Sequence, residues 1–308
     1  MHFPLLMPYP RILPRRIVPG AGRGTGYSRR RRRAEWFLAR FFAGGWASWL
    51  ARRVGLQSGP AVRRHELAFA DWPAGAPPLT VGFASDFHAG PTTSEDLLTA
   101  AVERLAEAGP DLVLLGGDFV SFTARYAHRV TRKLERLDPP LGKLAVLGNH
   151  DLWAHDPHVV ELLEGAGVRV LVNETVRLPP PWQEVSVVGL DDYTSGEPDA
   201  AAAFAGAAPF RLVLMHDPST LQAMDGRRFH LALAGHTHGG QVCLPGGVPI
   251  VTAEGGLARR YSRGLFALPE LAAGPDPARL LVSVGLGCSE LPVRLFAAPE
   301  VLVVRLSG

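Results

Sequence analysis

The most constraining feature of this 308-residue sequence is a series of short apolar runs, each followed at once by aspartate, histidine or asparagine. The first run covers residues 80–84, the second 112–115 and the third 144–147. Runs of this length, bounded by glycine and polar residues, are typical of buried β-strands. Helical spacing of apolar residues fills the intervals between them, so the order predicts an α/β fold with a largely parallel sheet covered by helices.

The remaining pattern extends this prediction along the chain. Ser94 is placed to cap a helix that runs to about residue 108 with its apolar side chains on one face. We expect further helices over residues 124–137 and 158–165. The later strands lie close to turns, which favours antiparallel pairing there. These strands are expected over residues 168–172, 185–190, 212–215, 231–234, 280–284 and 301–305.

The residues that follow the apolar runs are ones that a packed core rarely contains. Five motifs stand at these ends: Ser-Asp-Phe-His at 85–88, Gly-Gly-Asp at 116–118, Gly-Asn-His-Asp at 148–151, Met-His-Asp at 215–217 and Gly-His-Thr-His-Gly-Gly at 235–240. Ligand sites of α/β sheets lie beyond the carboxyl ends of the strands. We therefore expect one edge of the sheet to gather Asp86, His88, Asp118, Asn149, His216, His236 and His238.

The chemistry of this set indicates metal ions. In Asp86-x-His88 and His236-x-His238 the two side chains are two residues apart and lie on the same side of an extended segment. Mixed carboxylate and imidazole ligands suit manganese, iron or zinc better than an all-oxygen site would. Seven ligands are too many for one tetrahedral ion but fit two ions about 3.5–4 Å apart that share one carboxylate.

The ordered motifs resemble those of the calcineurin-like metallophosphoesterases over about residues 79–306. The resemblance implies a four-layer α/β/β/α sandwich with two mixed sheets and helices outside. It also implies that Asp86, His88 and His238 bind the first ion, that Asn149, His216 and His236 bind the second, and that Asp118 bridges both. The expected cofactors are two divalent ions, with Mn²⁺ favoured over iron, zinc or magnesium.

The same resemblance implies a reaction and one departure from the family pattern. A hydroxide shared by the ions would attack phosphorus, while His150 would face the substrate without binding metal and act as the catalytic residue. Many members carry an acid three residues after the bridging aspartate to orient this histidine, but here that position is Ser121. Either Ser121, Asp151 or a water molecule is then expected to take that role, or His150 is held less firmly.

The N-terminal quarter differs from the rest of the chain in charge. Residues 1–64 contain fourteen arginines, no lysine and one acid, a net charge of +13, so the remainder carries −10. We expect a basic arm over residues 1–78, in which 1–27 are disordered, 28–53 form an amphipathic aromatic helix and 54–78 are a linker. The metallophosphoesterase domain is expected over residues 79–308.

No run in the chain reaches the roughly 18 apolar residues of a membrane-spanning helix, because Arg40 interrupts the candidate at 36–51. Tryptophan and phenylalanine beside arginine favour association with an anionic membrane surface. There are two alternatives. The segment could be a leader packed on the domain, or a twin-arginine export signal that begins at Ser28-Arg29-Arg30. The expected location is therefore the cytoplasm or the cytoplasmic face of the membrane.

Three classes of function follow from these features. The favoured class is a metal-dependent phosphoesterase that acts on a phosphodiester, phosphomonoester or pyrophosphate, with a lipid-linked substrate in view of the aromatic segment; members of the similar bacterial branch hydrolyse phosphodiesters or the pyrophosphate of UDP-diacylglucosamine. A nuclease or nucleotide phosphodiesterase that holds nucleic acid with its arginines is less favoured. A metal-binding scaffold without turnover is the third class.

A few other residues have two interpretations each. Arg294 could bind a substrate phosphate or form a structural ion pair, and Tyr261-Ser262-Arg263-Gly264 has the same two interpretations. Asp191 and Asp192 are expected in a turn rather than at the site. Cys243 and Cys288 belong to no metal-binding pair and are expected to be isolated, buried thiols.

Overall fold

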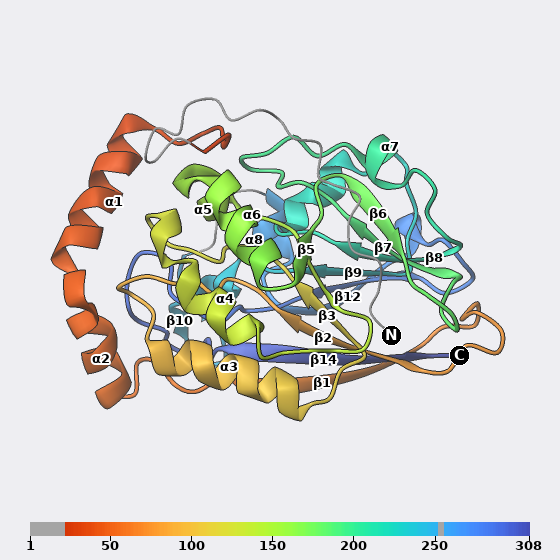
Figure 1. Ribbon diagram of the computed structural model, residues 1–308, viewed down its shortest axis with the longest axis horizontal. Helices are drawn as coiled ribbons and strands as arrows, with labels where there is room; N and C mark the ends of the chain where they lie inside the picture. Colours follow the sequence, from red (N-terminus) through yellow and green to blue (C-terminus); the bar gives the residue numbers. More distant parts are fainter. Residues whose placement is uncertain (1–21, 252–255) are drawn as a thin grey trace.

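The computed structural model describes residues 22–251 and 256–308 and confirms an α/β fold with two mixed sheets (Figure 1). The first sheet has the strand order β1-β14-β2-β3-β4-β5. β14 is antiparallel to β2, and all other pairs in this sheet are parallel. The strands are β1 (Ala61–Ala68), β2 (Leu79–Ala84), β3 (Leu112–Leu115), β4 (Lys143–Ala145), β5 (Val168–Val170) and β14 (Glu300–Ser307).

The second sheet has the strand order β12-β13-β9-β8-β7-β6. Its two outer pairs, β12–β13 and β6–β7, are antiparallel, and its central pairs are parallel. The strands are β6 (Glu174–Arg177), β7 (Val185–Gly189), β8 (Phe210–Leu214), β9 (Leu231–Ala234), β12 (Gly264–Leu268) and β13 (Ala278–Val282). A separate short hairpin pairs β10 (Cys243–Leu244) with β11 (Val248–Pro249).

Two helices precede the first strand, and the others lie between strands. They are α1 (Arg29–Phe41), α2 (Trp46–Arg53), α3 (Glu95–Glu107), α4 (His128–Leu134), α5 (Asn149–Ala154), α6 (Asp156–Gly165), α7 (Ala200–Ala203) and α8 (Gly256–Arg260). Short 3₁₀ segments cover Ala43–Gly45, Ala124–Tyr126, Pro218–Ala223, His238–Gly240 and Pro269–Leu271. The Ser94 hydroxyl accepts the Leu97 N–H and caps α3, as its position predicts.

Three apolar clusters confirm the four-layer arrangement, because alternate side chains of one strand point to opposite faces of its sheet. In β3, Val113 and Leu115 pack against α3, α4 and α6, whereas Leu112 and Leu114 face the second sheet. In β9, the even-numbered Ala232 and Ala234 pack on the outer side with α7. The order of layers is therefore helices, first sheet, second sheet, helices.

The expected linker contains a strand. Residues 61–68 form β1, which pairs with β14 along its whole length, so this part of 54–78 is built into the first sheet. β1 lies at the edge of the sheet and leaves Arg63, Arg64 and Glu66 exposed. Exposed charge is usual on edge strands, and it hides the alternation that predicts a strand. The expected helix over 124–137 is also shorter, since a 3₁₀ turn precedes α4.

The aromatic segment is helical, as predicted, and forms α1 and α2 along one side of the molecule (Figure 1). The expected disorder over 1–27 falls mainly on residues outside the described ranges. Residues 22–27 are described and contact the domain: Gly24 N–H donates to the Leu152 carbonyl and Thr25 N–H to the Ser195 carbonyl. Among the described residues, no helix combines the length and apolar character needed to cross a membrane.

Candidate metal centre

The predicted ligands leave five strands of the two sheets. Asp86 and His88 follow β2, Asp118 follows β3, and Asn149 begins α5 just after β4. The second sheet contributes His216 after β8 and His236 and His238 after β9. The carboxyl ends of these parallel strands lie at one edge of each sheet, and the two edges meet there. All seven predicted side chains therefore form one cluster.

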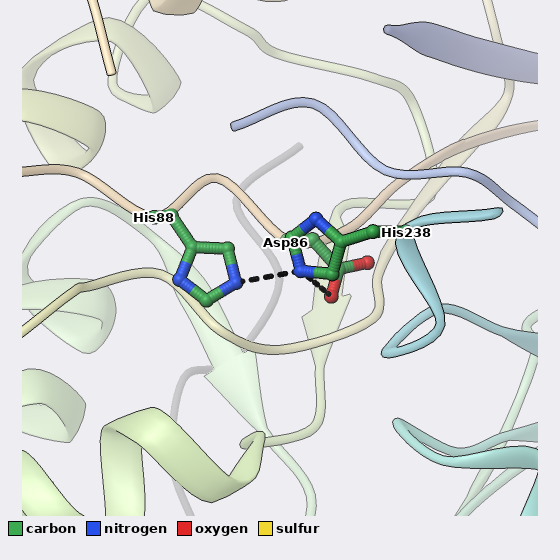
Figure 2. A group of neighbouring side chains, drawn as sticks. All are labelled: Asp86, His88 and His238. Carbon is green, nitrogen blue, oxygen red and sulfur yellow. Dashed lines mark hydrogen bonds and ion pairs between the residues drawn. The ribbon is translucent and has the colours of Figure 1, made fainter. Parts of the chain in front are cut away.

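The first part of this cluster joins Asp86, His88 and His238 (Figure 2). The Nε2 atoms of His88 and His238 are 2.9 Å apart, and His238 Nε2 lies 3.5 Å from Asp86 Oδ1. All three side chains are buried. A carboxylate oxygen and two imidazole nitrogens that converge in this way match the set predicted for the first ion.

The second part joins Asn149, His216 and His236. The Asn149 Oδ1 atom lies 3.2 Å from His216 Nε2 and 3.0 Å from His236 Nδ1, and these two nitrogens are 3.2 Å apart. The three residues match the set predicted for the second ion.

Asp118 lies between the two parts. Its Oδ2 atom is 3.3 Å from His88 Nε2 and 3.4 Å from His216 Nε2, so one carboxylate oxygen reaches a histidine of each set. Its Oδ1 atom accepts the backbone N–H of His150 at 2.9 Å. Burial alone would raise the pKa of Asp118, but His216 and His150 hold it well below its usual range. An ionised carboxylate at this position is what a shared ligand requires.

The backbone at the site has an unusual conformation. Asp86, His88, Asp118, His236 and His238 all have positive φ, between 44° and 69°. Residues other than glycine seldom adopt this left-handed conformation, and they do so mainly at sites where the surrounding structure enforces it. Five of the seven predicted ligands share it, so the packed strand ends hold these side chains in a costly but fixed orientation.

Two motif glycines are required by the close approach of the Asp118 and Asp86 carboxylates. A Cβ atom on Gly148 would lie 2.2 Å from Asp118 Oδ1, and one on Gly235 would lie 2.4 Å from Asp86 Oδ2. Neither contact can be relieved without moving a ligand. The glycines in Gly-Asn-His-Asp and Gly-His-Thr-His therefore leave room for carboxylates that come from a different strand.

Hydrogen bonds on the far side of each ring fix the orientation of three histidines. The Ser121 hydroxyl, which donates to the Ser289 carbonyl, lies 2.9 Å from His88 Nδ1, and the Gly116 carbonyl lies 2.7 Å from His216 Nδ1. Both rings then present Nε2 to the cluster. Arg294 is buried, its Nη2 lies 3.1 Å from His238 Nδ1, and its other nitrogens donate to the carbonyls of residues 287 and 297. It supports the ligand loops rather than facing a substrate.

The second part of the cluster fits a metal ion. His216 Nδ1–H donates to the Gly116 carbonyl, so in a neutral His216 the Nε2 atom carries a lone pair. This lone pair faces Asp118 Oδ2 and Asn149 Oδ1, and none of the three atoms has a hydrogen to donate. Burial by itself lowers the pKa of His216, but the nearby Asp118 overrides burial and raises it well above its ordinary value. The field at this point therefore favours a cation. His236 faces the cluster with Nδ1, while its Nε2 has no hydrogen-bond partner among the described residues and lies 3.8 Å from Asp217 Oδ2.

The remaining candidates have structural contacts. Asp191 accepts two hydrogen bonds from the Arg23 guanidinium, and Asp192 accepts the Ser195 N–H at 2.6 Å, which agrees with a turn. Burial raises the pKa of Asp192 to about 6. Arg263 donates to the Gly239 carbonyl and to Cys243 Sγ, so it holds the loop that carries His238. Cys243 and Cys288 are free and buried, as expected.

Sequence patterns did not predict two features beside the cluster. Trp153 packs on the ring of His150, with ring centroids 5.0 Å apart. Arg23, in the segment expected to be disordered, pairs with Asp156 at 3.0 Å and Asp191 at 2.6 Å. A tryptophan four residues after Asn149 gives no signal by itself, because helical spacing predicts only that the two residues share a face.

A buried cluster of aspartate, histidine and asparagine between the ends of two facing sheets is the kind of site that metal-dependent phosphoric ester hydrolases use, and this chain is one of them. Residues 79–240 match the family model described as calcineurin-like phosphoesterase. The chain belongs to this family.

Named relatives agree with this assignment. The chain is 32% identical to the uncharacterized metallophosphoesterase YkuE of Bacillus subtilis over 70% of this chain and 74% of that protein. It is 32% identical to the phosphodiesterase YaeI of Escherichia coli over 79% of this chain and 87% of that protein. It is 24% identical to the UDP-2,3-diacylglucosamine pyrophosphatase LpxG of Chlamydia muridarum over 72% and 81%, respectively.

Proposed function

We propose that the chain uses two divalent ions to hydrolyse a phosphodiester, a phosphomonoester or a pyrophosphate, with manganese as the favoured metal. The observation that carries this proposal is the position of Asp118, whose Oδ2 lies 3.3 Å from His88 and 3.4 Å from His216. One carboxylate oxygen between two ligand sets is the arrangement expected where two ions share a ligand. The sets are Asp86, His88 and His238 for one ion and Asn149, His216 and His236 for the other.

The residues of the chain have distinct parts in this proposal. Two bound ions would supply electrostatic stabilisation of the phosphoryl oxygens and would make a water molecule more acidic. The seven ligands hold that charge in a fixed place. His150 donates its proton to the leaving oxygen as the phosphorus–oxygen bond to that group breaks and the bond to the water oxygen forms. The water loses one proton to solvent, and solvent returns one to His150.

A lipid-linked substrate at an anionic membrane is the finer part of the proposal. Trp36, Phe37 and Phe41 on α1 are each more than 60% exposed, and Trp49 and Val54 continue the exposed apolar surface along α2 and just past its end. Arginines flank this surface on both sides in sequence, so it combines apolar side chains with positive charge. That combination is typical of helices that lie in a membrane interface. LpxG acts on a diacylated nucleotide sugar, which supports the same class of substrate.

The test is a hydrolysis screen of the metal-free protein with one metal added at a time. The substrates are 4-nitrophenyl phosphate, bis(4-nitrophenyl) phosphate, a nucleotide–lipid pyrophosphate and single-stranded oligonucleotides. We expect turnover of at least one phosphoester with Mn²⁺ and its complete loss in excess chelator. Full metal loading with no hydrolysis of any substrate would favour a scaffold, and turnover of oligonucleotides alone would favour a nuclease.

A further inference from the structure

The ring of His150 is held by other rings. It meets His88 edge-on, with centroids 4.8 Å apart, and packs on Trp153 at 5.0 Å with an interplanar angle of 60°. The two side chains expected to orient it are engaged elsewhere: Ser121 contacts His88, and Asp151 accepts backbone N–H groups of residues 119, 120 and 148. Within residues 22–251 and 256–308, no side chain forms a hydrogen bond with the His150 ring.

Trp153 is itself held by the N-terminal arm. The Tyr27 ring stacks on it with centroids 5.3 Å apart and an angle of 12°. The Arg31 guanidinium carbon lies 4.2 Å from its ring centroid. Its indole Nε1–H donates to the Thr25 carbonyl at 2.9 Å. Three groups of the arm therefore contact Trp153: an aromatic ring, a guanidinium cation and a carbonyl that accepts its hydrogen bond.

These arm residues form a fixed unit. Glu35 is only 4% exposed and accepts hydrogen bonds from the Tyr27 hydroxyl at 2.7 Å and from Arg31 Nε at 3.1 Å. Arg31 also reaches Glu290 on the domain at 3.4 Å. A buried carboxylate is costly unless it is paired, and here two donors satisfy it. Tyr27 and Arg31, which contact Trp153, are thus both held by the buried Glu35 carboxylate. This arrangement would not form on an arm that lies loosely on the surface.

From this geometry we propose that the arm is part of the active site: Thr25, Tyr27 and Arg31 position His150 through Trp153. The proposal rests on the proposed function only in giving His150 the proton-donating role. Trp153 is a positioning residue, because its ring limits rotation of the His150 ring toward or away from the leaving oxygen. Small misplacements of a catalytic group can cost about 10²-fold in rate, so loss of this support should lower the rate without removing metal.

The variants are Trp153→Ala, Trp153→Phe and Arg31→Ala. The matched control is Arg33→Ala, which removes the same charge from an exposed position of the same helix. Trp153→Phe keeps a ring against His150 and should restore most of the activity. Arg31→Ala changes an arm residue and leaves Trp153 itself in place, so it tests the proposal even if Trp153→Ala folds poorly.

The kinetic measurement compares two diesters at saturating Mn²⁺. 4-Nitrophenolate leaves without a proton, whereas phenolate needs one, so only diphenyl phosphate depends strongly on His150. We expect Trp153→Ala to lower kcat for diphenyl phosphate by about 10- to 100-fold and to affect bis(4-nitrophenyl) phosphate much less. Arg31→Ala should shift the ratio of the two rates in the same direction, and Arg33→Ala should not. Equal losses on both substrates would overturn the proposal.

A second measurement does not depend on turnover. Diethyl pyrocarbonate modifies accessible imidazoles, and peptide mass spectrometry can follow His150 alone in the metal-free protein. We expect faster modification of His150 in Trp153→Ala and Arg31→Ala than in the wild type and Arg33→Ala. Unchanged modification of His150 in both Trp153→Ala and Arg31→Ala would refute the proposal. If the wild type hydrolyses neither diester, the proposed function fails, and this measurement still decides whether the arm positions His150.

Discussion

The ligand cluster and the N-terminal arm differ in how the fold holds them. Each predicted ligand follows a buried strand of one of two sheets, and five of the seven have a left-handed backbone that only the surrounding packing can maintain. The arm is attached through ion pairs, ring contacts and a few hydrogen bonds, and much of its apolar surface is exposed. We therefore expect the cluster to open only with the whole domain and the arm to open locally.

The largest expected effect is at the shared ligand. Asp118→Asn removes the charge that lies between the two ligand sets and should lower kcat by about 10³-fold or more, because the transition state loses several kcal/mol of stabilisation. Metal content per chain, measured by mass spectrometry, should fall with it. Wild-type turnover by Asp118→Asn with unchanged metal content would contradict a shared carboxylate.

His150→Ala should separate proton transfer from metal binding. We expect a loss of about 10²–10⁴-fold in kcat, the range of general acid catalysis, with metal content close to that of the wild type. His236→Ala is the comparison, since it should lose metal as well as rate. A similar drop in metal content for both variants would make His150 a ligand and end its assignment as a proton donor.

The exposed rings of the arm should matter for membranes and little for soluble substrates. The double variant Phe37→Ser and Phe41→Ser removes two apolar side chains that are 65% and 64% exposed. We expect at least about tenfold weaker binding to anionic vesicles, measured by co-sedimentation, and unchanged kcat on a soluble diester. Leu265→Ser, which removes an exposed apolar side chain from β12, is the matched control. Failure of the wild type to bind vesicles at low salt would exclude a membrane role for the arm.

The smallest expected effect is at the tether of the arm. Arg23→Ala removes the pairs with Asp156 and Asp191 and should destabilise the attached segment by about 1–3 kcal/mol. Hydrogen exchange at the amides of Gly24 and Thr25 should accelerate, while exchange in the central strands stays unchanged. If hydrogen exchange accelerated equally in the strands and in the arm, the arm would open together with the domain, and the expected local opening would be wrong. Arg30→Ala, on the exposed side of α1, is the control.

Sequence patterns predicted the central strands better than the edges. β2, β3 and β9 lie where their apolar runs predict them, because central strands are buried on both faces and need apolar residues throughout. β1 was expected to be linker, since an edge strand has one hydrogen-bonded side and tolerates charge. The short helix α5, whose first residue is Asn149, was not expected either, because its six residues carry no periodic pattern long enough to detect.

The chain by itself determined which residues could meet, since a strand that ends in Asp-x-His or His-x-His must place those side chains beyond its carboxyl end. It could not determine what lies behind them. Arg294 reaches His238 across 56 positions, and Tyr27 of the arm reaches Trp153 across 126. Such contacts follow no local periodicity, because they depend on how separate elements pack. The sequence therefore determined which residues could form the proposed ligand set. Only the tertiary structure decided how its histidines are held and that the basic arm lies beside them.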